Sequence, residues 1–169
     1  MAASLSQPDP VGEVIFEIAT AAEMERLGGC LAKATNVEGA IYFLYGELGA
    51  GKTTLVRGFL RSLGYEGVVK SPTYTLVESY TLGQRCIYHF DLYRITDPDE
   101  LAYLGIQDYF DGHSLCLIEW PERGGDHLGK ADLEIRITYQ EWARRVAIKT
   151  CTTKGEAIIS SLNHLKLAI

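Results

Sequence analysis

The chain has 169 residues, enough for one domain with a full core and too few for two ordinary domains. The composition, 47% hydrophobic and 22% charged, is typical of a soluble globular protein. Its 16 basic and 22 acidic side chains give a formal net charge of −6, which argues against a protein that grips nucleic acid alone, because neutralising phosphates needs a clustered basic face.

Two further features bear on the compartment of the protein. No stretch approaches the roughly 18 apolar residues needed to span a membrane, and the N-terminus lacks the pattern of a signal peptide. The four cysteines are far apart and none lies in a C-x-x-C motif, so we expect small buried hydrophobic residues and neither a disulfide framework nor a zinc site. The protein is therefore expected to be cytoplasmic, with no membrane contact.

The N-terminal part of the chain predicts a strand followed by a helix. Residues 1–10 are polar, contain two prolines and are expected to be disordered. Residues 13–19 (EVIFEIA) are rich in β-forming side chains and predict a short strand. Thr20, with Glu23 three positions later, predicts a capping box at the start of a helix that runs to about Ala34.

The most informative stretch is a glycine-rich loop between a predicted strand and a predicted helix. Residues 46–53 (GELGAGKT) fit the phosphate-loop pattern G-x-x-x-x-G-K-S/T, with an apolar run at 40–45 before them and helical spacing at 54–63 after them. The glycines allow backbone N–H groups to point at phosphates, and the helix start adds free N–H groups and a positive dipole end. Lys52 is expected to reach the β- and γ-phosphates, and the Thr53 hydroxyl to bind magnesium.

An extended loop and a β-hairpin are predicted next. Pro72 restricts Ser71 to extended geometry, so residues 70–77 should form a loop that runs into a strand. The hydroxyls of Ser71 and Thr73 are suited to sensing a γ-phosphate, as in a switch segment, although a plain proline turn explains these residues equally well. Strand patterns at 78–80 and 85–93 predict a hairpin beside the nucleotide.

Two acids on predicted strands are candidates for the chemistry. Asp91 interrupts an apolar strand, where an unpaired carboxylate is costly. It is placed to orient the attacking water or to hold magnesium through water, or, equally well, it forms a salt bridge with Arg94 or another basic residue. Glu119 ends the apolar run 114–120, a predicted buried central strand, where a second magnesium ligand is expected. Trp120 is expected mainly to pack, with shaping of the catalytic pocket as the alternative.

The remaining segments complete an alternating pattern of helices and strands. Residues 97–100, with proline second, predict a helix start, and residues 122–130 a glycine-rich loop. Residues 132–139 and 145–150 predict a terminal hairpin, and residues 155–167 a closing helix. The tetrapeptide GKAD at 129–132 is similar to the guanine-reading pattern N-K-x-D, but glycine replaces the asparagine, which favours ATP over GTP.

Five blocks stand in the order and spacing of one family. They are Gly46–Thr54 (GELGAGKTT), Lys70–Thr75 (KSPTYT), His89–Arg94 (HFDLYR), Gly105–Phe110 (GIQDYF) and Ile118–Pro121 (IEWP). With these blocks, over roughly residues 13–168, the chain resembles the TsaE-type ATPases, which take part in the threonylcarbamoyl modification of tRNA adenosine next to the anticodon. The resemblance implies a single α/β domain over residues 1–169, a P-loop NTPase-like three-layer sandwich with a central mixed sheet and flanking helices.

The resemblance also implies cofactors, partners and residue roles. ATP or ADP and Mg²⁺ would be the cofactors, TsaD-like and TsaB-like proteins the partners, and tRNA would be reached only through that complex. Lys52, Asp91 and Glu119 would be catalytic, Thr53 and Glu119 would hold the metal, and Ser71, Pro72 and Thr73 would be the switch. The phosphates would lie on Glu47, Leu48, Gly49, Ala50, Gly51, Lys52, Thr53 and Thr54. The adenine pocket would use Thr20, Ala21 and a residue of the late hairpin, Arg144 or Arg145.

Two other functional classes stay open. A small-molecule P-loop kinase usually needs an arginine-bearing lid, and the only candidate lid, 122–130, holds one arginine, Arg123. A non-hydrolysing, nucleotide-dependent assembly factor would need only binding and partner control. Arg94 is the sole arginine beside a catalytic block, so an ATPase of this sequence is expected to be slow alone and to depend on a partner for further positive charge.

Overall fold

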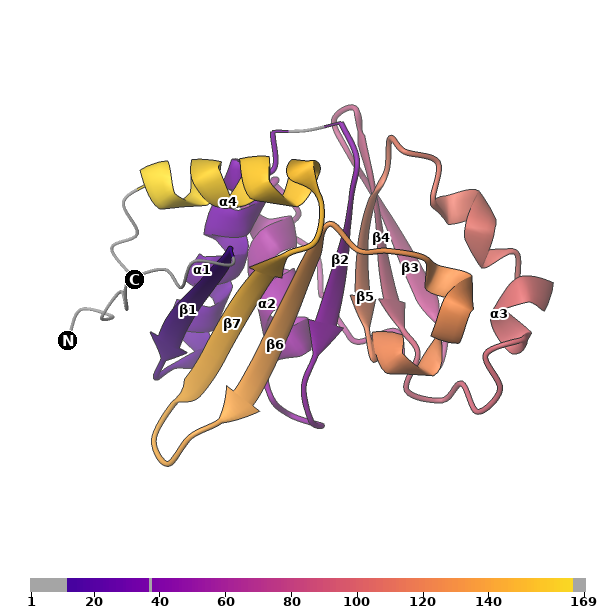
Figure 1. Cartoon of the computed structure of the whole chain (residues 1–169), viewed down its shortest axis with the longest axis horizontal. Coiled ribbons are helices and arrows are strands. Elements are labelled where there is room, and N and C mark those ends of the chain that lie inside the picture. Colours follow the sequence, from indigo (N-terminus) through magenta and orange to yellow (C-terminus); the bar gives the residue numbers. More distant parts are fainter. Residues whose placement is uncertain (1–11, 37, 166–169) are drawn as a thin grey trace.

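The computed structural model describes residues 12–36 and 38–165, which form a seven-stranded mixed sheet with helices against it (Figure 1). The strands are β1 (Glu13–Ile18), β2 (Ala40–Tyr45), β3 (Val77–Leu82), β4 (Arg85–Asp91), β5 (Leu115–Glu119), β6 (Leu133–Tyr139) and β7 (Arg144–Thr150). The helices are α1 (Ala21–Ala34), α2 (Lys52–Ser62), α3 (Glu100–Tyr103) and α4 (Thr153–His164), with short 3₁₀ helices η1 (Ile106–Tyr109), η2 (Pro121–Arg123) and η3 (Gly125–Leu128). The expected disorder of residues 1–10 lies outside the described residues.

The strand order β1-β7-β6-β2-β5-β4-β3 puts the phosphate-loop strand at the centre of the sheet. β2 runs parallel to β5 and β6, and β4 runs parallel to β5, whereas both predicted hairpins, β3–β4 and β6–β7, are antiparallel. Every residue of β5 is buried, as its apolar sequence predicts for a strand covered on both faces. The carboxyl ends of β2, β4 and β5 therefore meet at one edge of the sheet, where ligands of open α/β sheets bind.

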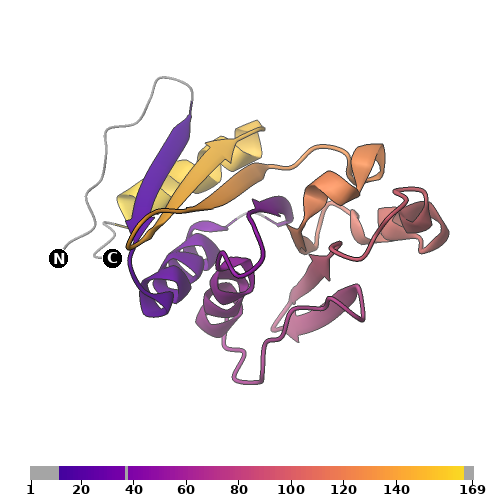
Figure 2. The same ribbon diagram turned by 90° about the horizontal axis from the view of Figure 1, so that it is seen from below.

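Helical segments cover both faces of the sheet. Figure 2 shows α1 and α2 side by side under one face, and a large apolar cluster joins them and α4 to the strands. The opposite face, over β2, β4 and β5, is covered by residues 92–110 and 120–131, the segments before and after β5, which contain α3 and the 3₁₀ helices. The predicted mixed sheet with flanking helices is confirmed, although this second layer consists of very short helices.

Helix α1 begins as its sequence predicts and packs closely on α2. The Thr20 side chain accepts a hydrogen bond from the Glu23 backbone N–H, and the Glu23 carboxylate accepts from the Thr20 N–H, so the capping box is complete. Gly28 of α1 faces the carbonyl of Leu55, and Gly58 of α2 faces the carbonyl of Glu25, with no room for a side chain at either glycine. The two helices thus approach backbone to backbone.

The helix predicted to start within residues 97–100 starts at the last of them and is only four residues long. α3 begins at Glu100 with Asp99 as its N-cap, so Pro98 precedes the helix and does not occupy its first position. The Glu100 carboxylate accepts the N–H groups of Thr96 and Asp97, which holds the preceding residues in a turn. Glycine-rich 122–130 is also not a plain loop, because it contains η2 and η3.

The cysteine prediction is only partly right. Cys116 is buried, and burial raises the pKa of its thiol to about 12. Cys30 and Cys151 are half-buried, and Cys86, near the β3–β4 turn, is exposed.

In the part of the chain that the structure describes, no helix is both long and apolar enough to cross a membrane.

Candidate nucleotide site

The loop between β2 and α2 has the geometry of an anion site. Gly49 and Gly51 have φ values of +74° and +118°, a region that residues with a side chain rarely adopt. α2 begins at Lys52, and its N-cap, Gly51, makes no side-chain cap bond. The first turn also contains no acidic residue. The N–H groups at this helix start therefore remain available to phosphate oxygens.

Lys52 is buried within the loop with its amine held by backbone carbonyls. Nζ donates to the carbonyl oxygens of Gly46 at 2.6 Å and Glu47 at 2.9 Å, and it lies 4.3 Å from the centre of a Trp120 ring. Burial lowers the pKa of Lys52 from its ordinary value, and the nearby Glu119 carboxylate opposes that effect. Among the described residues Lys52 forms no ion pair, so incoming phosphates would give this partly desolvated cation a directly bonded negative partner.

Thr53 and Glu119 lie against each other across the loop. The Thr53 hydroxyl donates to Glu119 Oε1 at 2.8 Å, and Glu119 is 3% exposed although it ends its strand. A third residue joins them, because His89 Nε2 lies 2.8 Å from the same Oε1 and His89 is fully buried. Sequence reasoning gave His89 no role. The available signal was its place two residues before Asp91, since residues two apart in a strand point to the same face.

Asp91 is paired with the hydroxyls of the predicted switch. Its Oδ2 accepts hydrogen bonds from Thr73 Oγ1 at 3.0 Å and from Ser71 Oγ, and its Oδ1 accepts from the Tyr93 N–H at 2.9 Å. These donors offset the cost of burying the carboxylate. The alternative salt bridge to Arg94 is wrong: among the described residues Asp91 has no such ion pair, and the Arg94 guanidinium lies over Tyr74.

The register of the parallel strands brings the two acids together. Asp91 of β4 pairs with Glu119 of β5, which in turn pairs with Leu44 at the end of β2.

Residues 12–36 and 38–165 contain no cluster of three or more histidine, cysteine or acidic side chains that could hold a metal. A hydroxyl and one carboxylate beside a phosphate site nevertheless suit Mg²⁺, which keeps several waters and takes few protein ligands when it binds with a nucleotide.

Trp120 has a larger part in this site than packing alone. Its backbone φ is +56°, a sparsely populated value for a bulky residue, directly after Glu119. The Lys52 amine lies over one ring of the Trp120 indole, and the centres of the Trp120 and Tyr93 rings are 5.0 Å apart. Besides packing, Trp120 therefore lines the cavity at the phosphate loop, as the alternative expectation for this residue has it.

Two adjoining cavities contain the predicted site residues. One, of about 190 Å³, is lined by Leu48, Gly49, Ala50, Gly51, Lys52, Thr53, Thr54, Ser71, Thr73, Asp91, Tyr93, Glu119 and Trp120. The other, of about 160 Å³, shares Gly49, Ala50, Gly51 and Thr54 with it and continues to the start of α1 and to β7. There it brings together Thr20, Ala21 and Arg144, whereas Arg145 does not line it. Glu47 and Pro72 line neither of these two cavities, although Glu47 holds Lys52 through its carbonyl.

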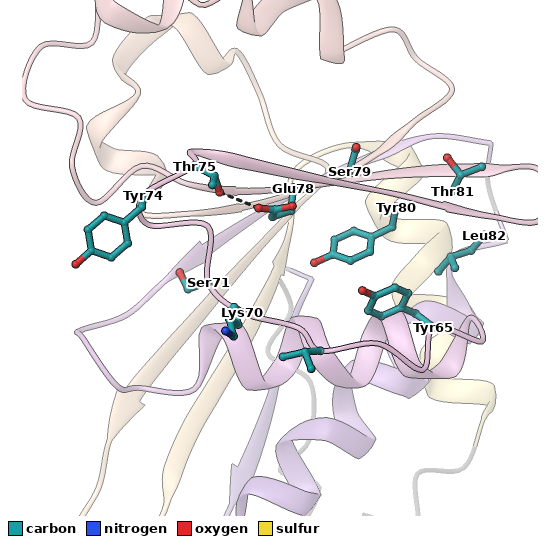
Figure 3. A pocket seen from close by; sticks show the side chains of 11 residues that line it. Tyr65, Lys70, Ser71, Tyr74, Thr75, Glu78, Ser79, Tyr80, Thr81 and Leu82 are labelled. Carbon is teal, nitrogen blue, oxygen red and sulfur yellow. Dashed lines mark hydrogen bonds between the residues drawn. The ribbon is translucent and has the colours of Figure 1, made fainter.

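A larger cavity, of about 580 Å³, lies next to the phosphate cavity, between β3 and the loop that precedes it (Figure 3). Tyr65 and Tyr80 face each other in it at a ring distance of 4.8 Å, and Tyr74 points away from them. It shares Ser71 with the phosphate cavity but contains no residue of the phosphate loop. Size alone therefore does not locate the nucleotide, and the smaller pair of cavities has the suitable chemistry.

Comparison with known proteins identifies the family. The family model described as "Threonylcarbamoyl adenosine biosynthesis protein TsaE" matches residues 18–147, most of the chain. The chain belongs to the TsaE family. Its TsaE relatives include the tRNA threonylcarbamoyladenosine biosynthesis protein TsaE of Haemophilus influenzae, 48% identical over 134 residues, which are 79% of this chain and 85% of the relative. The protein of the same name from Bacillus subtilis is 41% identical over 99 residues, 59% and 61% of the two chains.

The fold of this TsaE-family chain is also that of a solved structure. The crystal structure of YdiB from Bacillus subtilis matches it with a TM-score of 0.80 and 27% sequence identity, over 95% of this chain and 100% of YdiB. The predicted resemblance to the TsaE family and the predicted α/β fold are both confirmed.

Proposed function

We propose that this chain is an ATP-binding and ATP-hydrolysing subunit required for N6-threonylcarbamoyladenosine modification of tRNA. One observation carries the proposal: a complete phosphate loop opens onto a cavity lined by Lys52, Thr53, Asp91 and Glu119, in a chain of the TsaE family. The relatives are named for biosynthesis of that modification. Of the five main cavities among the described residues, this one alone joins the phosphate loop to two buried acids.

The residues divide the work of binding and hydrolysis between them. The loop N–H groups and the Lys52 amine would bind the phosphates, Lys52 exchanging the carbonyls of Gly46 and Glu47 for phosphate oxygens. Thr53 and Glu119 would hold Mg²⁺, which supplies charge neutralisation at the phosphates. Asp91 would orient the attacking water, since its carboxylate already collects hydroxyl donors at the cavity wall.

The base pocket and the preference for ATP have structural support. Thr20, Ala21 and Arg144 line the cavity that extends from the phosphate loop, and the Arg144 guanidinium already stacks at 4.0 Å over an aromatic ring, that of Tyr139. Asp132 is the acid of the tetrapeptide that is similar to the guanine-reading pattern, and both of its carboxylate oxygens accept hydrogen bonds. One comes from the Ile41 N–H at the start of β2, and the other from the Thr152 hydroxyl at the start of α4. That is the end of β2 opposite to the phosphate loop, so Asp132 cannot read a base.

The kinase alternative receives little support. Residues 122–130 do not form an open lid, because Leu128 is buried against the face of the sheet opposite α1 and α2. Arg123 donates to the Ile95 carbonyl and lies near the rings of Tyr93 and Trp120, but it does not itself line the phosphate cavity. The non-hydrolysing assembly factor shares every binding residue with the ATPase, so only turnover distinguishes the two.

Partners would complete the function. We propose TsaD-like and TsaB-like proteins as partners in the cytoplasm, with tRNA bound through that complex, because a chain of net charge −6 is poorly suited to bind tRNA alone.

The test has two parts. Phosphate release from magnesium ATP is measured with the purified chain, and tRNA modification is then reconstituted from the TsaD–TsaB-like pair with and without it. We expect slow hydrolysis, and modification only when the chain is present. Modification without the chain would overturn the proposal, whereas modification by a chain that binds but never hydrolyses ATP would favour the assembly factor. Appearance of a phosphorylated small molecule would favour the kinase.

A further inference from the structure

His89 is a buried histidine that the proposed reaction does not yet use. It lies on β4 beside Leu117 of β5, has no exposed surface, and contacts Glu119 Oε1 through Nε2 at 2.8 Å. Its other ring nitrogen, Nδ1, is buried without a hydrogen-bond partner among the described residues. A residue that served packing alone would be better replaced by an apolar side chain, because a buried unpaired nitrogen costs free energy.

The hydrogen bond fixes the ring in one orientation. An ionised carboxylate only accepts hydrogen bonds, so the proton of a neutral His89 is assigned to Nε2. Thr53 donates to the same Oε1, which therefore receives two donors from two different elements. Glu119 Oε2 receives none from the described residues and stays available to a metal ion or to a metal-bound water.

We propose that His89 is a positioning residue that presents the Glu119 carboxylate to Mg²⁺. The inference rests on the proposed nucleotide function and adds a residue to it. Glutamate has one more rotatable bond than aspartate, so a glutamate at a strand end needs an additional contact to hold its carboxylate in one place. His89 supplies that contact from the neighbouring strand, and while Nε2–H holds Oε1, Oε2 has no donor among the described residues and is left for the metal. Partners of this kind around metal-ligating groups commonly change metal affinity by about tenfold or more.

The test compares two substitutions at one position. His89→Leu removes the donor and fills the space, whereas His89→Gln keeps an N–H donor at a similar distance from the backbone. ADP affinity is measured by titration calorimetry with Mg²⁺ and again with chelator, so that the ratio isolates the metal contribution. We expect His89→Leu to reduce this ratio about tenfold while leaving the affinity in chelator unchanged, and His89→Gln to restore most of the ratio.

A matched histidine elsewhere serves as the control. His113 Nδ1 contacts Glu38 Oε1 at 2.9 Å, but this pair is 70% and 79% exposed and remote from the loop. His113→Leu should leave the ratio at its original value. A purely structural role of His89 would instead lower ADP affinity equally with and without Mg²⁺, and that result would overturn the inference. Equal ratios for His89→Leu and the unchanged chain would also overturn it.

A second measurement needs no substitution and decides the case if His89→Leu fails to fold. Nitrogen-15 NMR of the histidines in the unchanged chain should show a slowly exchanging Nε2–H at His89 that shifts when Mg²⁺ is added to the ADP complex. If the Nε2–H proton exchanged rapidly with water, or if Mg²⁺ left its chemical shift unchanged, this inference would be overturned while the proposed function would stand. A chain that binds no ADP at all would overturn the proposed function and this inference with it.

Discussion

Lys52 and Thr53 are the side chains that touch the phosphates and metal in the proposed complex. Lys52→Ala and Thr53→Ala should each reduce ATP hydrolysis about a hundredfold or more, because each removes charge or coordination from the transition state. Both variants should fold. Burying the charge of Lys52 costs free energy that alanine does not incur, and Thr53 is only half-buried, so neither side chain is needed for the core. Phosphate release and thermal unfolding measure the two effects. Unchanged hydrolysis by either variant would contradict the assignment of the loop.

Glu119 and Asp91 should differ in what they contribute. Glu119→Ala should weaken magnesium-dependent ADP binding about tenfold or more, because a metal ligand is lost. Asp91→Asn keeps the size of the side chain and one acceptor oxygen, so it should reduce turnover about a hundredfold with a much smaller effect on binding. Calorimetry and steady-state hydrolysis separate the two. An equal loss of ADP–magnesium affinity in both variants would reject this division of roles.

At the residue scale, local patterns found the phosphate loop but not all of its neighbours. The motif spans eight consecutive residues, so Lys52 and Thr53 can be recognised without any knowledge of the fold. The contact between His89 and Glu119 depends on the register of β4 against β5, which no local pattern reveals. Thr20 and Arg144 are separated by most of the chain, so only the family resemblance suggested that they share a cavity.

The contact between α1 and α2 makes its own prediction at the scale of elements. Gly58→Ala should lower the free energy of unfolding by about 2 kcal/mol or more, because the added Cβ would overlap the Glu25 carbonyl of α1. The matched control is Gly29→Ala, where the nearest atom would be Ser62 Cβ at an ordinary 3.4 Å and alanine favours the helix. Chemical denaturation measures both. Equal stability of the two variants would show that the helices separate at little cost.

Elements with strong local signals were predicted accurately, and weak ones were not. β2 occupies the predicted residues 40–45, and α1 starts at its predicted capping box. The prediction for α3 was inaccurate because the Glu100 carboxylate binds back to Thr96 and Asp97, and because Gly105, with φ +68°, follows the last capping residue and ends the helix after four residues. There, turn chemistry and packing of Leu101 on the sheet decide the structure instead of helix propensity.

The whole molecule is expected to be a slow ATPase that its partners accelerate. In the described structure Arg94 lies over Tyr74 and Arg123 is bound to a backbone carbonyl, so neither is directed at the phosphate cavity. Positive charge for the transition state would therefore come from another protein. Adding the TsaD–TsaB-like pair should raise phosphate release at least about tenfold, as measured by steady-state titration.

Partner binding should in turn depend on the nucleotide. Ser71 and Thr73 are fixed by Asp91 in the cavity, and Ser71 also lines the adjacent larger cavity, so nucleotide and partner can act on the same segment. Such coupling is reciprocal, and the pair should bind with different affinity in ATP analogue and in ADP. Full turnover without partners, or identical affinities in both nucleotides, would contradict this view.

The pairing of β1 has a consequence for biosynthesis of the protein itself. Within the described sheet β1 pairs only with β7, the strand made last, and more than a hundred residues separate the two. At ordinary rates of translation the first strand waits on the order of ten seconds for its partner. Meanwhile the apolar side chains of Val14, Phe16 and Ile18 have no sheet to join, and such a strand is prone to wrong pairing. A ribosome that stalls before residue 144 would therefore leave an unfinished, aggregation-prone chain, even though its phosphate loop is complete.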